Sequence, residues 1–279
     1  MAQKRCQPVK KSSRGEPPNF LGQHFMHNKK LIAEIVNQAN ITREDTVLEL
    51  GAGKGALTSV LSQRAGKVLA VEYDHELVDI LKQKFPKTNI TIIHRDILRI
   101  HLPREPFVVV SNIPYAITTP IMKKLLSNPC TSFQRGVIVM EKGAAKRFTA
   151  APVKDPYVIS WRMWFELKYV RTISRRNFSP PPSVDSAMVM VRRRDKPIVP
   201  YGNYRLFQAV AQHGLKHPEL PIDLALRGVF TSPQLQRLKR NLEITAPTAI
   251  GALSEQQWGV IFDTMVKYVP KFRWPRAKL

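Results

Sequence analysis

The four residues Asn112-Ile113-Pro114-Tyr115 place an amide, a stiff turn and an aromatic ring directly after an apolar run. These residues could bind a planar exocyclic amine that attacks a methyl group. The lone pair of such an amine is delocalised into the ring, so the amine is a poor nucleophile. The Asn112 oxygen and the Ile113 carbonyl can accept from the two N–H bonds and direct the lone pair. Such orientation lowers the reaction barrier, and stacking on Tyr115 is worth ~1–3 kcal/mol per base. The structural alternative is an Asx-type turn that ends a strand.

A glycine-rich turn lies upstream, where Thr46–Leu50 reads as a buried strand and Gly51-Ala52-Gly53 precede Lys54-Gly55 and a helical pattern. Glycines are needed where a backbone turns sharply and lies against a ligand, because a Cβ would intrude there. The motif alone is weak evidence, since plain strand-to-helix connections also use glycine. It nevertheless predicts the first ligand-binding turn of an open α/β sheet.

Two acidic residues follow the next strands. The apolar run Lys67–Val71 ends at Glu72, at the interval expected for a carboxylate that binds ribose hydroxyls. The run Ile90–His94 leads to Asp96, which can accept from the amine of an adenine, although Asp after a strand is also common turn chemistry. A fourth run, Phe107–Ser111, ends at Asn112. The carboxyl ends of parallel strands share one edge of a sheet, so these side chains should converge.

The remaining pattern divides the chain. Asn28 is a plausible N-cap for a helix, and we expect a helix over 117–126 and strands over 136–140, 167–173 and 187–191. From Tyr201 onward strand signals vanish, and helices are expected over 204–215, 222–230, 233–242 and 255–269, the last with a Ser254/Gln257 capping box. We therefore predict a basic flexible arm over 1–18, a doubly wound α/β domain over 19–194 and a small all-α domain over 195–279.

The charge balance is strongly basic, with a formal net charge of +23 and a pI near 10.3. Such an excess implies a polyanionic partner, and nucleic acid is favoured over a membrane surface because no basic amphipathic membrane helix is visible. A merely soluble basic surface is the alternative. The two cysteines, Cys6 and Cys130, read as free thiols without metal spacing. With no apolar membrane span and no secretory signal, we expect a cytoplasmic protein without membrane or metal partners.

Taken together, these motifs resemble the S-adenosylmethionine-dependent rRNA adenine N6-methyltransferase family. The likeness rests on the glycine turn, Glu72, Asp96 and Asn112-Ile113-Pro114-Tyr115, and Gln23-His24-Phe25 and 178–186 resemble further family motifs. Within the family, the chain is most similar to the Erm-type 23S rRNA methyltransferases, which 140–148 and 161–165 also resemble. Housekeeping small-subunit dimethylases share the fold and usually carry Leu in place of Ile113.

The resemblance implies a Rossmann-like methyltransferase domain over 19–194 that binds S-adenosyl-L-methionine, and a helical, basic C-terminal domain over 195–279 that binds RNA. It also assigns roles to single residues. Gln23, His24 and Met26 would edge the cofactor pocket, although the family often has Asn where this chain has His24. The cofactor would also contact Gly51, Ala52, Gly53, Glu72 (ribose), Asp96 (adenine amine), Ile97 and Asn112. Asn112, Ile113 and Pro114 would orient the target nitrogen, and Tyr115 and Phe178 would stack on the target base.

The same resemblance implies that one adenine in the peptidyl-transferase loop of 23S rRNA is methylated or dimethylated. In the Erm branch this modification gives resistance to macrolide, lincosamide and streptogramin B antibiotics. We expect a monomer whose RNA contacts come from basic residues, each of which has solvated surface charge as its alternative. The candidates are Lys142, Lys146, Arg147, Arg162, Arg175, Arg176, Arg192, Arg193 and Arg194.

Four other functions share some of these features. An NAD-dependent dehydrogenase would use a glycine turn and an acid after the second strand, but it gives no role to Asn112–Tyr115 or to the charge. A non-enzymatic nucleic-acid-binding relative would not need Asn112 and Tyr115 intact. A small-subunit rRNA dimethylase shares the fold but usually carries Leu in place of Ile113. A DNA adenine methylase stays open, because the preference for RNA rests on the resemblance alone.

Overall fold

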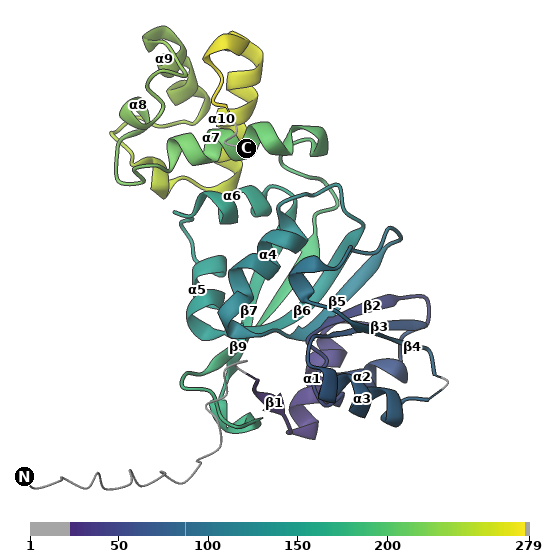
Figure 1. Ribbon diagram of the computed structural model, residues 1–279. Helices are drawn as coiled ribbons and strands as arrows, with labels where there is room; N and C mark the ends of the chain where they lie inside the picture. Colours follow the sequence, from purple (N-terminus) through teal and green to yellow (C-terminus); the bar gives the residue numbers. More distant parts are fainter. Residues whose placement is uncertain (1–22, 87, 277–279) are drawn as a thin grey trace, which may run out of the picture.

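The computed structural model describes residues 23–86 and 88–276, so the predicted arm over 1–18 and Cys6 lie outside the described residues. A seven-stranded mixed sheet runs through the larger part of the molecule (Figure 1). The predicted sheet strands are all present. Their order is β4 (Ile90–His94), β3 (Lys67–Glu72), β2 (Thr46–Leu50), β5 (Phe107–Asn112), β6 (Phe133–Glu141), β9 (Ser186–Arg193) and β7 (Phe165–Ile173).

The first five strands in this order are parallel, whereas β9 and β7 each run antiparallel to their neighbours. Parallel pairing requires a crossover between strands, and helices on both faces supply it. The strand order reverses between β2 and β5. From β2 the chain moves to β3 and β4 on one side, whereas from β5 it moves to β6 on the other side. In open α/β sheets this reversal leaves a crevice at the carboxyl ends of the two strands.

Alternate residues of each strand face different helices. Val47, Val68 and Val108 pack with α1 (Lys29–Gln38) and α2 (Ala56–Ser62), and α3 (His75–Lys84) lies on the same face through Leu81 and Ala70. Leu48, Leu50 and Val109 face the opposite way, towards α4 (Thr118–Leu126) and α5 (Lys142–Thr149). As predicted, Asn28 caps α1, because its side chain accepts from the amides of Lys30 and Leu31.

Two short strands form a separate ribbon that the sequence did not predict. β1 (Phe25–Met26) pairs antiparallel with β8 (Phe178–Ser179), with Met26 opposite Phe178. A further bond runs from the Asn28 side chain to that of Asn177, at 2.7 Å. The ribbon therefore joins the N-terminal segment to the proline-rich loop after the 3-10 turn η3 (Arg175–Asn177).

The helical C-terminal region contains α7 (Tyr204–Gly214), α8 (Ile222–Ala225), α9 (Ser232–Asn241) and α10 (Glu255–Tyr268). The predicted Ser254/Gln257 capping box begins α10. The helix predicted over 222–230 ends after four residues. An additional helix, α6 (Pro156–Arg162), was missed, although Asp155 caps it and Pro156 occupies its first turn, where proline is well tolerated.

Aromatic rings connect the C-terminal helices to the sheet domain. Phe207 of α7 lies edge-on to Trp164 and to Trp258, with ring centroids 5.9 and 6.4 Å apart. All three rings belong to one buried apolar cluster, which continues from the sheet into the helices. The apolar face predicted for α10 is confirmed, since Trp258, Ile261, Phe262 and Met265 are buried in it.

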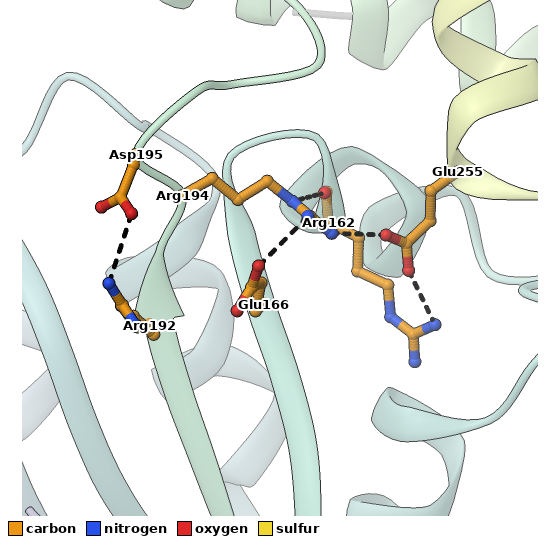
Figure 2. A network of polar contacts seen from close by, with 6 residues as sticks. All are labelled: Arg162, Glu166, Arg192, Arg194, Asp195 and Glu255. Carbon is orange, nitrogen blue, oxygen red and sulfur yellow. Dashed lines mark hydrogen bonds and ion pairs between the residues drawn. The ribbon is translucent and has the colours of Figure 1, made fainter.

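An arginine–glutamate network stabilises the same junction (Figure 2). Glu255, at the start of α10, accepts from Arg162 of α6 at 3.3 Å and from Arg194. Arg194 also pairs with Glu166 at 3.4 Å and donates to the Arg162 carbonyl at 2.9 Å. The Arg162 side chain is only 6% exposed, whereas that of Glu166 is 58% exposed. Glu255 is therefore the main counter-charge for two largely buried guanidinium groups.

Within the residues that the structure describes, no helix is long and apolar enough to cross a membrane. Nor does any group of three or more His, Cys, Asp or Glu side chains there have the arrangement of a metal site.

We predict that Glu255→Gln lowers the free energy of unfolding by about 2–4 kcal/mol, because it leaves the charges of Arg162 and Arg194 without their counter-charge in the interior. Urea unfolding measures the change. Glu166→Gln is the matched control, and its effect should stay below about 1 kcal/mol because that pair is exposed to solvent. Equal effects of the two substitutions would contradict the assigned role of Glu255.

Candidate functional site

The site begins at the turn after β2, which is bonded to the neighbouring strand. The amides of Gly51 and Ala52 both donate to the Val71 carbonyl, at 2.9 and 3.0 Å. Gly53 has φ +56°, and a Cβ there would lie 3.1 Å from the Phe25 ring. Glycine is thus required at this position both for the left-handed backbone and for the close approach of β1.

A cavity of about 600 Å³ opens at this edge of the sheet. This volume is typical of a site for a small organic ligand. Every residue predicted to contact the cofactor lines this cavity. These residues are Gln23, His24, Met26, Gly51, Ala52, Gly53, Glu72, Asp96, Ile97 and Asn112.

Backbone amides fix the carboxylate of Glu72 at the end of β3. One oxygen accepts from the Gly53 amide at 2.8 Å, and the other accepts from the amides of Tyr73 and Asp74 at 2.8 and 3.0 Å. The residue is buried at 7% exposure and lines the cavity. A carboxylate oxygen has lone pairs beyond those used here, so Glu72 can accept further hydrogen bonds from ligand hydroxyls.

Asp96 lies beyond the end of β4, where it caps the 3-10 turn η1 (Ile97–Arg99) by accepting from the Leu98 amide at 2.8 Å. The alternative turn role for Asp96 is therefore real, but it occupies one oxygen. The other oxygen is 3.7 Å from Arg99, in an exposed pair. Ile97, which is buried at 5% exposure, provides an apolar wall beside this acid.

Asn112 occupies the end of β5 and is held by a single long-range bond. Its amide nitrogen donates to the His24 carbonyl at 3.0 Å, which fixes the orientation of the side chain. Its oxygen is buried and has no hydrogen-bond partner among the described residues. Nor does the Ile113 carbonyl accept a hydrogen bond from any of the described residues. An unsatisfied buried acceptor costs about 1–3 kcal/mol, so it calls for a functional explanation.

Tyr115 follows in the 3-10 turn η2 (Tyr115–Ile117) and lines the cavity. Its hydroxyl forms a short hydrogen bond with that of Ser186, at the start of β9. Burial raises the pKa of the Tyr115 hydroxyl above its ordinary value, so the ring stays neutral. The His24 ring lies beside it, with centroids 5.8 Å apart, and His24 Nδ1 is 2.9 Å from the Pro180 carbonyl.

Phe178 departs from the prediction that it stacks on a target base. Its ring is 2% exposed and packs in the apolar cluster beneath α1, and the residue does not line the cavity. Pairing of β8 with β1 explains the burial, because it turns Phe178 inward and leaves Ser179 at the cavity. In this conformation Phe178 supports the ribbon and offers no face to a base.

The predicted RNA-contacting residues other than Arg162 fall into two groups, which lie at opposite ends of the sheet strands. Lys142, Lys146 and Arg147 lie on α5, which begins where β6 ends, beside Asn112. Arg175 and Arg176 are exposed in η3, directly before the ribbon. In β9, by contrast, Arg192 pairs with Arg135 at the beginning of β6, whereas Ser186 pairs with Glu141 at its end. The segment 192–194 therefore lies far along the sheet from the cavity.

Three arginines that were predicted to contact RNA bind partners within the protein instead. Arg162 is buried in the network with Glu255, and Arg194 shares that network. Arg193 donates to the carbonyls of Phe133, Pro129 and Thr131, at 2.6–2.8 Å. These guanidinium groups are structural because they satisfy buried partners. Arg192 is exposed and pairs with Asp195 at 3.3 Å.

Other cavity residues were not predicted. Glu49, in β2, is 1% exposed and accepts from the Thr58 hydroxyl at 2.6 Å. Burial raises the pKa of its carboxyl to about 8, and the nearby charge of Glu72 adds to the rise. An acid inside an otherwise apolar strand next to the glycine turn was the available signal. Tyr73 and Asp74 also line the cavity, and Gln23 donates to Asp74 at 3.0 Å.

Comparisons with known proteins place the chain in one family. The profile of the family described as ribosomal RNA adenine dimethylase matches residues 18–267. An rRNA adenine N-6-methyltransferase of Bacillus licheniformis is 60% identical over 96% of this chain and 94% of its own length. The ribosomal RNA small subunit methyltransferase A of Lactococcus lactis is 30% identical over 88% of each chain.

Among solved structures, that of the 23S rRNA methyltransferase ErmE superposes with a TM-score of 0.76 and 26% identity. The match covers 87% of this chain and 99% of the other. The likeness therefore includes both the sheet and the C-terminal helices.

We predict that the contribution of Glu49 to the free energy of unfolding falls as pH rises from about 4.5 to about 8. In this window the folded protein keeps a proton on Glu49 that the unfolded chain has released, because the folded pKa is the higher one. The contribution approaches ~1.4 kcal/mol per pH unit. Urea unfolding of wild type and Glu49→Gln at pH 5.5, 7.0 and 8.5 isolates it, since Gln can still accept from Thr58. If the substitution leaves the pH dependence unchanged, Glu49 is not protonated in the folded state.

Proposed function

Because the chain belongs to the ribosomal RNA adenine dimethylase family, and is thereby an rRNA adenine N6-methyltransferase, we propose that S-adenosyl-L-methionine is its methyl donor. We further propose that its target is one adenine in the peptidyl-transferase loop of 23S rRNA. The large-subunit target is supported by the likeness to ErmE, which is a 23S rRNA methyltransferase. The 60% identity to a protein named as an rRNA adenine N-6-methyltransferase supports the same branch.

The donor fits the cavity through residues that keep hydrogen-bonding capacity there. Glu72 would hold the ribose hydroxyls, and Asp96, beside Ile97, would accept from the adenine amine of the donor. Gly51, Ala52 and Gly53 let the backbone approach the methionine portion, which Gln23, His24 and Met26 border. When bound, the donor supplies an electrophilic methyl group on a sulfonium. The protein has only to orient the two reactants and exclude water.

The single observation that carries the proposal is the buried, unpartnered oxygen of Asn112. It would accept one N–H of the target adenine N6, and the Ile113 carbonyl would accept the other. Pro114 restrains this turn, and the neutral ring of Tyr115, fixed through Ser186, would stack on the base. With both N–H bonds held, the nitrogen lone pair points at the methyl group, and the proton is released to solvent after transfer.

The target adenine must leave its stack to reach this pocket, at a cost of a few kcal/mol. We propose that Lys142, Lys146, Arg147, Arg175 and Arg176 offset the cost by contacting RNA phosphates beside the cavity. Arg147 is already oriented by a 2.7 Å bond to the Thr119 hydroxyl. On this proposal the protein acts in the cytoplasm as a monomer and confers resistance to macrolide, lincosamide and streptogramin B antibiotics.

A small-subunit rRNA target is the second candidate, because the chain is also 30% identical to a small-subunit methyltransferase over most of its length. Primer extension on 16S and 23S rRNA from cells with and without the protein separates the two. A new stop at one adenine of 23S rRNA is the expected result. A stop in 16S rRNA alone would overturn the proposed target and leave the family unchanged.

We predict that Asn112→Ala lowers the methyl-transfer rate at saturating rRNA by at least about a hundredfold, because the amine loses the acceptor that directs its lone pair. Isothermal titration should show that S-adenosyl-L-methionine still binds within about threefold of wild type. Ser111→Ala, one residue earlier and outside the cavity lining, is the control for a local folding defect. Normal turnover by the Asn112 variant would refute the acceptor role.

We predict that RNA affinity falls steeply with salt, and that Lys142→Ala/Lys146→Ala reduces the slope of log K against log [salt] by about 1.5. Each phosphate contact contributes about 0.7–0.9 to that slope. Filter binding to a 23S rRNA fragment between 50 and 300 mM salt measures it. Arg192→Ala, at the opposite end of the strands, should leave the slope unchanged. If Arg192→Ala lowers the slope and the two lysine substitutions do not, the RNA binds at the other end of the strands.

A further inference from the structure

The glycine turn contains a lysine to which the proposed function gives no role. Lys54 follows Gly53 and lines the cavity, and it is the only lysine or arginine among the described residues that do so. Its side chain lies over the Phe25 ring of β1, with Nζ 4.7 Å from the ring centroid. The same ring closely approaches Gly53, where a Cβ would lie 3.1 Å from it. The turn and β1 therefore hold the Lys54 side chain against a ring that also lines the cavity.

The charge of Lys54 is not used by any carboxylate in the described part of the chain. None of the ion pairs there involves this residue, which is exposed. An ammonium group has three N–H donors, and contact with a ring face leaves donors available for an anion. Lys54 can therefore bind an anionic group of a ligand without breaking an internal ion pair.

The acidic side chains of the cavity define which part of a ligand this lysine suits. Two histidines line the cavity as well, but an imidazole carries a charge only when protonated. S-adenosyl-L-methionine has a sulfonium and an ammonium group, both cationic, and one carboxylate. Acids suit the cationic groups, whereas the carboxylate is best matched by a cation. The acidic residues of the lining are Glu49, Glu72, Asp74 and Asp96.

The place of Lys54 in the chain agrees with the end of the donor that bears the carboxylate. In the proposed binding mode, the methionine portion lies at the glycine turn, to which Lys54 belongs. The ring beneath Lys54 is that of Phe25, which lies in the chain between His24 and Met26. These two residues are the ones assigned to the border of the methionine portion. Charge and position therefore indicate the same group of the donor.

We propose that Lys54 binds the carboxylate of the methionine portion of the donor. The inference rests on the proposed function, since it takes S-adenosyl-L-methionine as the donor. Lys54 is a binding residue on this account and takes no part in methyl transfer. It selects the complete donor over analogues that keep the nucleoside and the sulfonium but lack the carboxylate.

Isothermal titration with S-adenosyl-L-methionine and with decarboxylated S-adenosylmethionine tests the assignment, because these ligands differ only in the carboxylate. Wild type should bind the complete donor about tenfold more tightly, as expected for a charge-assisted hydrogen bond in a partly enclosed site. Lys54→Met keeps an unbranched side chain against Phe25 but removes the charge. It should bind the complete donor about tenfold more weakly than wild type does, and the decarboxylated analogue no more weakly. Lys54→Arg, which keeps the charge, should retain most of the preference.

Lys82→Ala is the matched control, because it removes an exposed lysine of α3 that does not line the cavity. It should bind both ligands as wild type does. The proposal is overturned if Lys54→Met weakens the binding of both ligands equally, if it changes neither, or if the Lys82 control loses the same preference.

An RNA phosphate is the other anion that Lys54 could meet, and filter binding of Lys54→Met to a 23S rRNA fragment addresses it. The slope of log K against log [salt] should equal that of wild type. If the slope falls by about 0.7–0.9 while donor binding is unchanged, Lys54 contacts RNA and the proposal is wrong. Failure of wild type to bind either ligand would refute the proposed donor and this inference with it. A wild type that binds both ligands equally would refute only the role of Lys54.

Discussion

The hydrogen bond from the Asn112 amide to the His24 carbonyl determines what the site can do. By using the nitrogen, it leaves the oxygen buried without a partner. The bond joins β5 to the segment that enters β1, and β1 is held in turn by β8. The orientation of one side chain therefore depends on residues about ninety and seventy positions away, which only the folded sheet brings together. This is how a rigid scaffold can maintain an acceptor that is unsatisfied in the absence of substrate.

Much of the fold could be predicted because the parallel strands are short apolar runs that end in polar residues. Lys67–Glu72 and Phe107–Asn112 show this pattern, Thr46–Leu50 is followed by the glycine turn, and the carboxyl edge follows from parallel pairing. The missed elements lacked that periodicity. β1 and β8 are two residues each, and α6 was not predicted although Asp155-Pro156 is a valid helix start. The helix α8 ends after four residues, within an apolar run, and the sequence alone does not show where in that run the helix ends.

The site was predicted less completely, for a reason that is physical. Residue type and spacing indicate which groups can meet at a sheet edge, and Glu72, Asp96 and Asn112 do line one cavity. They do not indicate which face of a two-residue strand turns inward, and this is why Phe178 is buried. Glu49 was not predicted because the raised pKa of its carboxyl comes from burial in the folded sheet, which residue type and spacing do not give.

The same limit explains the arginines. A chain with net charge +23 invites the assumption that its cations face a polyanion. Yet Arg162, Arg193 and Arg194 donate hydrogen bonds to backbone carbonyls and to Glu255. A guanidinium group can do this because its five donors lie in a planar fork that bridges several acceptors at once. Lysine cannot make that fork. In this protein the buried junction between sheet and helices is built from arginine, whereas α5 carries both lysine and arginine. Burial and pairing, and not charge alone, therefore separate the cations that hold the two parts of the protein together from those that can meet RNA.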